Sequence, residues 1–184
     1  LDATADEAEM VYIDLLCDID YNGGLVIDGG RLITFMLNDY TLNIVNDAGT
    51  ALEVSESAYV NYDRGPGGKG ELNAISRAGG HGVYAHDRGI AWITNATAEN
   101  AGGAGGVAVL AVGANSHAIL DGDASCTNPY AEIPGAVLAG DGASVVVEGD
   151  VFCAGNLADF EALAGVAAVG SASVETEGSV IVSY

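Results

Sequence analysis

The chain has 184 residues and a formal net charge of −21, because 26 Asp and Glu face only 5 Lys and Arg. That negative field disfavours nucleic acid and anionic membrane surfaces as partners, since both bind clustered cations. Hydrophobic residues make up 49% of the chain, which is more apolar surface than an acidic disordered segment carries, so we expect a folded protein.

The N-terminal segment predicts a short cap. Thr4 and Glu7 have the spacing of a helix-capping box, which favours a helix over residues 5–10. We therefore expect Thr4–Met10 to form a small cap, with residues 1–22 comprising the cap and the first strand. No signal-peptide pattern follows Leu1, so we expect either a leader that has been removed or a piece of a longer chain.

The rest of the chain is an internal repeat. The segment Ala143–Cys153 (ASVVVEGDVFC) matches Ser116–Cys126 (SHAILDGDASC) and Ala172–Ile181 (ASVETEGSVI), and Gly89–Glu99 keeps the same apolar positions. A second short strand precedes each copy, and Thr50–Val60 repeats the same order of strand, turn and strand upstream. These preceding strands are expected at Gly82–His86, Val107–Val112, Ala136–Gly140 and Val166–Val169.

Units of this length, each with two or three short strands, fit one coil of a parallel β-solenoid. We predict an all-β, single-domain solenoid of about six to seven coils, with residues 23–184 forming the stacked coils. Leu120, Val147 and Thr176 should then form one internal row. We expect Arg64–Lys69 and Thr127–Pro134 to leave the coils as side loops, and Leu157–Ala164 to form a short helix within an insertion.

The segment Gly23–Asp47, GGLVIDGGRLITFMLNDYTLNIVND, resembles the opening coils of secreted or cell-surface bacterial right-handed parallel β-helix proteins of the pectate-lyase-like superfold. The later segments of the form SVxVEGDV resemble the coils that follow the opening ones in those proteins. The resemblance implies a right-handed helix and an extracellular or cell-surface location. Some members of this superfold are polysaccharide lyases or hydrolases and many are stalks or adhesins, so the resemblance implies a fold more than an activity.

Two columns of carboxylates follow from the repeat alignment. Asp121, Glu148 and Glu177 share one column, and Asp123 and Asp150 share another. Like charges at one strand spacing repel. Solvation and salt, raised carboxyl pKa values or a bound hard cation would each relieve that repulsion, and calcium is the cation such oxygen ligands favour.

The three cysteines lack metal-site spacing. Cys126 and Cys153 occupy one repeat position, which predicts neighbouring coils and leaves open either a disulfide or two stacked inward thiols. We expect Cys17 to be unpaired in the first strand.

The best local group for catalysis is His86, Asp87 and Arg88, with His117 about one coil away. Turns bring such residues together without chemistry, so the sequence favours a non-enzymatic role. A polysaccharide-active β-helix lyase or hydrolase remains the alternative, and it would use these four residues.

Three aromatic residues on neighbouring repeat units could stack on sugar rings if they face outward, although core packing or isolated surface positions are the more common use of such rings. They are Tyr59, Tyr62 and Trp92. The sequence therefore favours an acidic structural or adhesive domain of a bacterial surface or fibre protein, with a glycan or protein partner. Because the last residues, SVIVSY, resemble a strand without a cover, we expect either a further stretch of chain or a second copy of the molecule to cover it, the latter by self-association through the C-terminal coil.

Overall fold

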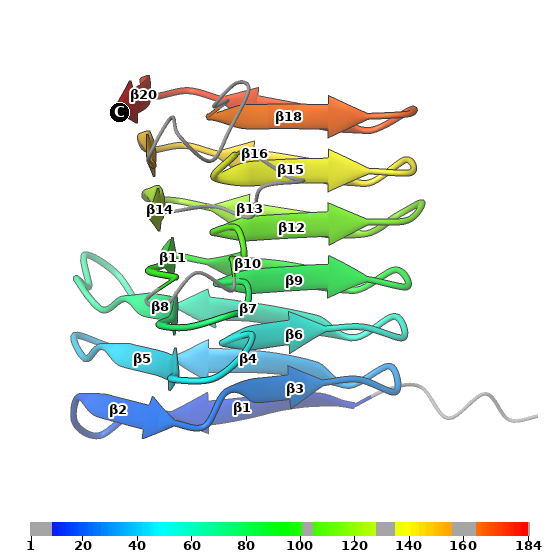
Figure 1. Ribbon diagram of the computed structural model, residues 1–184. Coiled ribbons are helices and arrows are strands. Elements are labelled where there is room, and N and C mark those ends of the chain that lie inside the picture. The colour runs from blue at the N-terminus through cyan, green and yellow to red at the C-terminus, as the bar shows by residue number, and fades with distance from the viewer. Residues whose placement is uncertain (1–8, 101–104, 128–134, 156–164, 184) are drawn as a thin grey trace, which may run out of the picture.

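The computed structural model describes residues 9–100, 105–127, 135–155 and 165–183. These residues form twenty strands arranged in three parallel sheets. In Figure 1 the chain crosses the front through β9, β12, β15 and β18, returns behind, and climbs as it turns, which makes the solenoid right-handed. The predicted all-β, right-handed parallel β-helix is confirmed. None of the described segments is a helix long and apolar enough to cross a membrane.

Each coil contributes one strand to each sheet, so that strands distant in sequence become neighbours. Sheet A contains β1 Met10–Asp14, β4 Leu32–Met36, β7 Tyr59–Asp63, β10 Ile90–Ile93, β13 His117–Leu120, β16 Ser144–Val147 and β19 Ser173–Thr176. Sheet B contains β2 Ile19–Asn22, β5 Leu42–Asn46, β8 Leu72–Ser76, β11 Asn95–Ala98, β14 Ala124–Thr127, β17 Val151–Ala154 and β20 Val180–Ser183. Sheet C contains β3 Leu25–Ile27, β6 Leu52–Val54, β9 Val83–His86, β12 Val109–Val112, β15 Val137–Gly140 and β18 Val166–Val169.

The register confirms the internal row expected from the repeats. Leu120 pairs with Val147, and Val147 pairs with Thr176. Leu120 and Val147 are fully buried. Because strands in a parallel sheet repeat at about 4.8 Å, like residues meet directly above one another and the insertions between strands leave this spacing unchanged.

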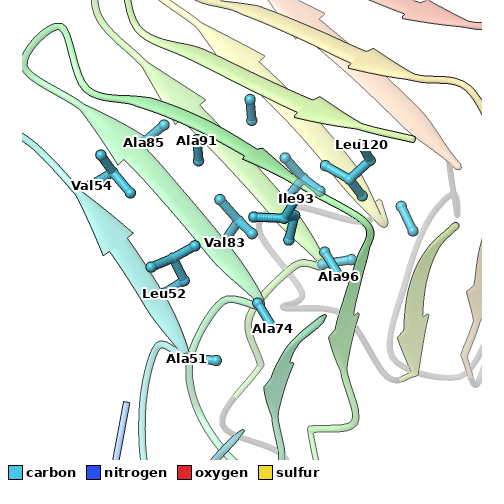
Figure 2. Packing of buried hydrophobic residues seen from close by; sticks show 14 of the residues in the cluster. Ala51, Leu52, Val54, Ala74, Val83, Ala85, Ala91, Ile93, Ala96 and Leu120 are labelled. Carbon is cyan, nitrogen blue, oxygen red and sulfur yellow. The ribbon is translucent and has the colours of Figure 1, made fainter. Parts of the chain in front are cut away.

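The core is a column of small and branched apolar side chains enclosed by the three sheets. Figure 2 shows Leu52, Val83 and Ile93 pointing into this interior from strands of sheets C and A. All three side chains are fully buried. The alternation of buried and half-buried residues along β16, with Val145 and Val147 inside, is the period-two pattern of a strand with one solvent face.

The boundaries differ from expectation in places. Met10 belongs to β1 rather than to an N-terminal cap, because its apolar neighbours continue into an alternating strand that pairs with β4. Residues 4–8 of the predicted cap, most of the loop Thr127–Pro134 and the predicted helix Leu157–Ala164 lie outside the described residues. The segment Arg64–Lys69 is a loop between β7 and β8, as predicted.

Glycines allow close approach where sheet B turns into sheet C. A Cβ on Gly80 would lie 2.0 Å from the backbone carbon of Gly49, and one on Gly106 would lie 1.9 Å from the carbonyl oxygen of Gly80. Both distances are far inside van der Waals contact, so only glycine fits at these stacked corners.

Both ends of the described solenoid expose apolar residues. At the first coil an apolar pocket of about 240 Å³ opens among Ile13, Leu15, Ile19, Tyr21, Leu25, Ile33, Phe35, Leu42 and Ile44. At the other end Val169, Val180 and Ile181 are exposed. The strands of each end pair on one side only within the described part of the chain.

Candidate functional site

A continuous polar ladder runs along the corner between sheets A and B. Its first half consists of side-chain amides, each of which donates to the residue one coil below. Asn95 Nδ2 donates to Asn73 Oδ1 at 2.9 Å, Asn73 Nδ2 donates to Asn43 Oδ1 at 3.0 Å, and Asn43 Nδ2 donates to Asp20 Oδ1 at 2.8 Å. The amides therefore connect successive coils outside the backbone hydrogen bonds.

The second half of the ladder uses backbone amides as donors. The N–H of Asp123 donates to Asn95 Oδ1 at 2.8 Å and the N–H of Asp150 donates to Asp123 Oδ1 at 2.8 Å. The N–H of Ser179 donates to Asp150 Oδ1 at 2.7 Å. The sequence analysis left open a bound cation, raised carboxyl pKa values, or solvation and salt as what relieves the repulsion between Asp123 and Asp150. In the structure each of these carboxylates also accepts a charge-assisted hydrogen bond from a backbone N–H of the next coil.

The other carboxylate column lies at the same corner. The backbone N–H groups of Asp121, Glu148 and Glu177 donate to Ile93, Leu120 and Val147 one coil below. The two Glu side chains are exposed, whereas Asp121 is half-buried. Among the described residues no group of three or more His, Cys, Asp or Glu side chains is arranged to hold a metal ion, so calcium binding by either column stays a prediction.

Asp121 joins two aromatic residues from lower coils. Its Oδ1 accepts a hydrogen bond from Trp92 Nε1 at 2.6 Å, and its Oδ2 accepts one from the Tyr62 hydroxyl. The pKa of Tyr62 is raised to about 12, first by burial and then by the hydrogen bond to this carboxylate. Sequence reasoning placed Asp121 in a metal set and the aromatic residues in a sugar platform, but the fold brings all three together.

Arg64 completes this corner from the loop that follows β7. Its guanidinium lies 4.9 Å from the centre of the Tyr62 ring. Its Nε donates to the carbonyl of Gly70 at 2.8 Å and its Nη2 donates to Thr94 Oγ1 at 3.2 Å. These contacts hold the side loop against the shaft.

The three predicted sugar-stacking residues do not share one environment. The ring of Tyr62 packs against the core, while Tyr59 is half-buried beside Ile90 on sheet A. Trp92 has 38% of its surface exposed. Sugar stacking by this set stays a prediction, and within it Trp92 offers the most exposed ring face.

A groove of about 420 Å³ runs along the outer face of sheet B. It crosses four consecutive strands, β8, β11, β14 and β17. Its lining combines side-chain amides, hydroxyls, one carboxylate and two apolar side chains. The lining residues are Asn73, Ile75, Asn95, Thr97, Asp123, Ser125 and Phe152.

On sheet C, His86 lies between two carboxylates. Its Nε2 lies 3.1 Å from Glu53 Oε1 and its Nδ1 lies 2.9 Å from Asp87 Oδ2. Its ring stacks on Tyr84 with centroids 4.3 Å apart. Burial lowers the pKa of His86, but the hydrogen bonds to Glu53 and Asp87 outweigh it, so the net direction is upward.

The other members of the predicted catalytic group are differently placed. Arg88 and Asp87 occupy left-handed turn conformations, with φ of 68° and 47°, and the backbone N–H of Arg88 donates to Ser116 Oγ at 3.0 Å. His117 opens β13 in sheet A, in register with Ile90 and Ser144. In the described part of the chain, hydrogen bonding joins His86 to Asp87 and to Glu53, which sequence reasoning missed, rather than to His117.

Cys126 and Cys153 are register partners on neighbouring strands, as the repeat predicted, and both are free thiols with 1% of their surface exposed. Burial raises the pKa of Cys126 to about 12 and that of Cys153 to about 11. Cys17 is also free and exposed. It lies in the bend between β1 and β2 rather than in the first strand, where the sequence predicted it.

Comparison of the chain with family models, with curated proteins and with solved structures found no match. The groove on sheet B and the asparagine half of the ladder were missed at the level of sequence. The available signal was an Asn at the second position of the strands Leu42–Asn46 and Leu72–Ser76 and at the first position of Asn95–Ala98.

Proposed function

We propose that the chain is a non-enzymatic structural or adhesive β-helix domain of an extracellular bacterial surface or fibre protein, which presents its outer faces to glycan or protein partners. The observation that carries this proposal is the unbroken stacking of three parallel sheets with a polar ladder along one corner. Each coil is joined to the next by both backbone and side-chain hydrogen bonds. Such a shaft is suited to holding surface side chains at fixed spacing.

The charge distribution supports an extracellular, non-nucleic-acid role. The formal net charge of the chain is −21. No lysine or arginine follows Arg88 in the sequence, whereas Asp and Glu continue to occur after it. An acidic coat repels polyanions. The partners that fit this coat are neutral glycans or protein surfaces that carry positive charge.

Self-association belongs to the same proposal. The last strand of sheet B, β20, exposes Val180 and Ile181, with 46% and 43% of their surfaces accessible. It pairs on one side only in the described residues, and an unpaired edge with apolar side chains is a template for another strand. The first test is light scattering over a range of concentrations, and a monomer mass at all of them contradicts this part.

A second candidate is a polysaccharide-active enzyme, favoured by one observation. His86, held between Glu53 and Asp87 with a raised pKa, is a group that can donate a proton near neutral pH. The test incubates the protein with a panel of polysaccharides and measures both retention and new chain ends. Retention without new ends supports the structural role, whereas new ends that disappear in the variants His86→Gln and Arg88→Ala support the enzyme.

A further inference from the structure

The groove on sheet B has its shape because of one outward row of side chains. Ile75 pairs with Thr97, Thr97 with Ser125, and Ser125 with Phe152. The short Thr97 and Ser125 side chains lie between the larger Ile75 and Phe152, which leaves the middle of the row hollow. At about 4.8 Å per strand, this row covers three strand steps, or about 14 Å along the solenoid axis.

One wall of the groove is the polar ladder, which retains hydrogen-bonding capacity. Asn95 uses one amide hydrogen on Asn73 and one carbonyl lone pair on the N–H of Asp123, so a second hydrogen and a second lone pair remain. Asp123, which also lines the groove, accepts the N–H of Asp150 on Oδ1, so its second carboxylate oxygen keeps accepting capacity. Together with the hydroxyls of Thr97 and Ser125, the groove offers donors and acceptors at fixed positions.

The backbone of this face offers no partner to a peptide. The four strands that carry the groove each have a neighbour on both sides in sheet B. Their backbone N–H and C=O groups are therefore hydrogen-bonded to the neighbouring strands of the sheet. A peptide that binds by adding a strand needs an unpaired edge. The occupant must therefore be recognised by side chains alone.

A neutral sugar chain meets that requirement. Sugar hydroxyls both donate and accept, which matches the amides, hydroxyls and carboxylate of the wall, while the apolar faces of the rings match Phe152 and Ile75. The groove lining contains the carboxylate Asp123 and no Lys, Arg or His, and the formal net charge of the chain is −21. A polyanionic glycan would be repelled, so charge selects a neutral one.

We infer that the groove formed by Asn73, Ile75, Asn95, Thr97, Asp123, Ser125 and Phe152 binds a neutral oligosaccharide lying along the solenoid axis, with Phe152 as the stacking surface. This inference rests on the proposed glycan-presenting role and assigns that role to sheet B. It differs from the platform of Tyr59, Tyr62 and Trp92 expected from sequence.

The test is calorimetric titration with neutral hexasaccharides of glucose, xylose and mannose, and with a galacturonic acid hexamer as the anionic probe. Ser125→Phe fills the hollow and Phe152→Ala removes the stacking ring. Val146→Phe adds the same ring to the outward position of β16 on sheet A and is the matched control. We expect at least one neutral probe to bind, a loss of affinity of tenfold or more in both groove variants, and unchanged affinity in the control.

Thermal melting of each variant separates a lost site from a lost fold. Thr97→Val, at a half-buried outward position of β11, provides a second groove variant if Phe152→Ala unfolds. Binding of neutral probes that survives in all folded groove variants places the site elsewhere: the inference is then wrong and the proposed function stands. Binding only of the anionic probe, or of none of the four, also overturns the inference. The proposed function is judged separately by retention on larger polysaccharides and by self-association.

Discussion

Asp121 and Tyr62 are 59 residues apart in sequence, yet the Asp121 carboxylate accepts a hydrogen bond from the Tyr62 hydroxyl. The same carboxylate accepts the indole N–H of Trp92, which is 29 residues away. One side chain therefore joins three coils at the corner between sheets A and B. Because the Tyr62 hydroxyl is half-buried, its partner cannot be replaced by bulk water without cost.

We expect Asp121→Ala to lower the free energy of unfolding by about 1–3 kcal/mol, the usual cost of leaving a half-buried donor unpaired. Urea denaturation followed by Trp92 fluorescence measures the change. The matched control is Glu148→Ala, which removes an exposed carboxylate from the same column and should change stability by less than about 0.5 kcal/mol. Equal effects at the two positions would show that the Asp121 contacts contribute nothing.

The two stacked carboxylates of the ladder give a second prediction. Asp150→Asn keeps an oxygen to accept the N–H of Ser179 while it removes the repulsion from Asp123. We expect the variant to match or exceed wild-type stability at low salt, with the difference shrinking as salt screens the charges. Melting temperatures at two ionic strengths measure it.

Calcium binding by Asp123 and Asp150 would give a different result for the variant Asp150→Asn. If Asp123 and Asp150 hold the ion, millimolar calcium raises the melting temperature of the chelator-treated wild type and fails to raise that of Asp150→Asn. If the backbone amides satisfy both carboxylates, calcium leaves both melting temperatures unchanged.

The glycine corner gives the largest expected effect. A methyl group on Gly80 would meet the backbone of Gly49 at 2.0 Å, and backbone cannot move aside as a flexible side chain can. We expect Gly80→Ala to destabilise the protein by about 3 kcal/mol or more through overpacking. Gly140→Ala is the control, because its added methyl would meet only a Val112 methyl group, at 4.0 Å; comparable losses in both variants would contradict the close approach.

The His86 contacts predict a pH dependence. The groups that face its ring are Glu53, Asp87 and Tyr84, with His81 beyond Tyr84. Because the folded pKa of His86 is raised above its ordinary 6.5, the stabilisation is fully present below that value and is lost as pH rises through the folded pKa.

We expect His86→Gln to be less stable than wild type at pH 5.5–6.0, with the difference narrowing towards pH 8. Urea midpoints across this range measure it. His81 titrates in both proteins, with a pKa lowered by burial, so the comparison cancels its contribution. The control His117→Gln changes an imidazole that opens β13 on sheet A, and a pH-independent gap between wild type and His86→Gln would contradict the proposed ion pairs.

The cysteines should separate into one reactive and two protected thiols. Cys17 is exposed, whereas Cys126 and Cys153 are buried and have raised pKa values, so little thiolate forms at either one. A thiol reagent at pH 8 should label one residue in the folded protein and three after unfolding without reductant. A count of one after unfolding would establish the disulfide that the repeat alignment left open.

Part of this architecture could be predicted because it depends on local composition and on the repeat. The row of Leu120, Val147 and Thr176 follows from the copies near 116, 143 and 172, which have almost constant length. The earlier coils differ more in length, and Leu52 pairs with Val83 at a separation of 31 residues. Where insertions vary, alignment of a single sequence loses the register, and the contacts that depend on it are lost as well.

The class of fold could be predicted from the repeat pattern, since alternating apolar residues in short, repeated strands are buried when one coil stacks on the next. Which polar side chains meet depends instead on the three-dimensional register of the coils. Asn43 lies 30 residues from Asn73, and Asn73 lies 22 residues from Asn95, yet each pair is hydrogen-bonded. The physical reason is that parallel pairing sets the distance between neighbouring coils, whereas the number of residues in the intervening loops varies freely.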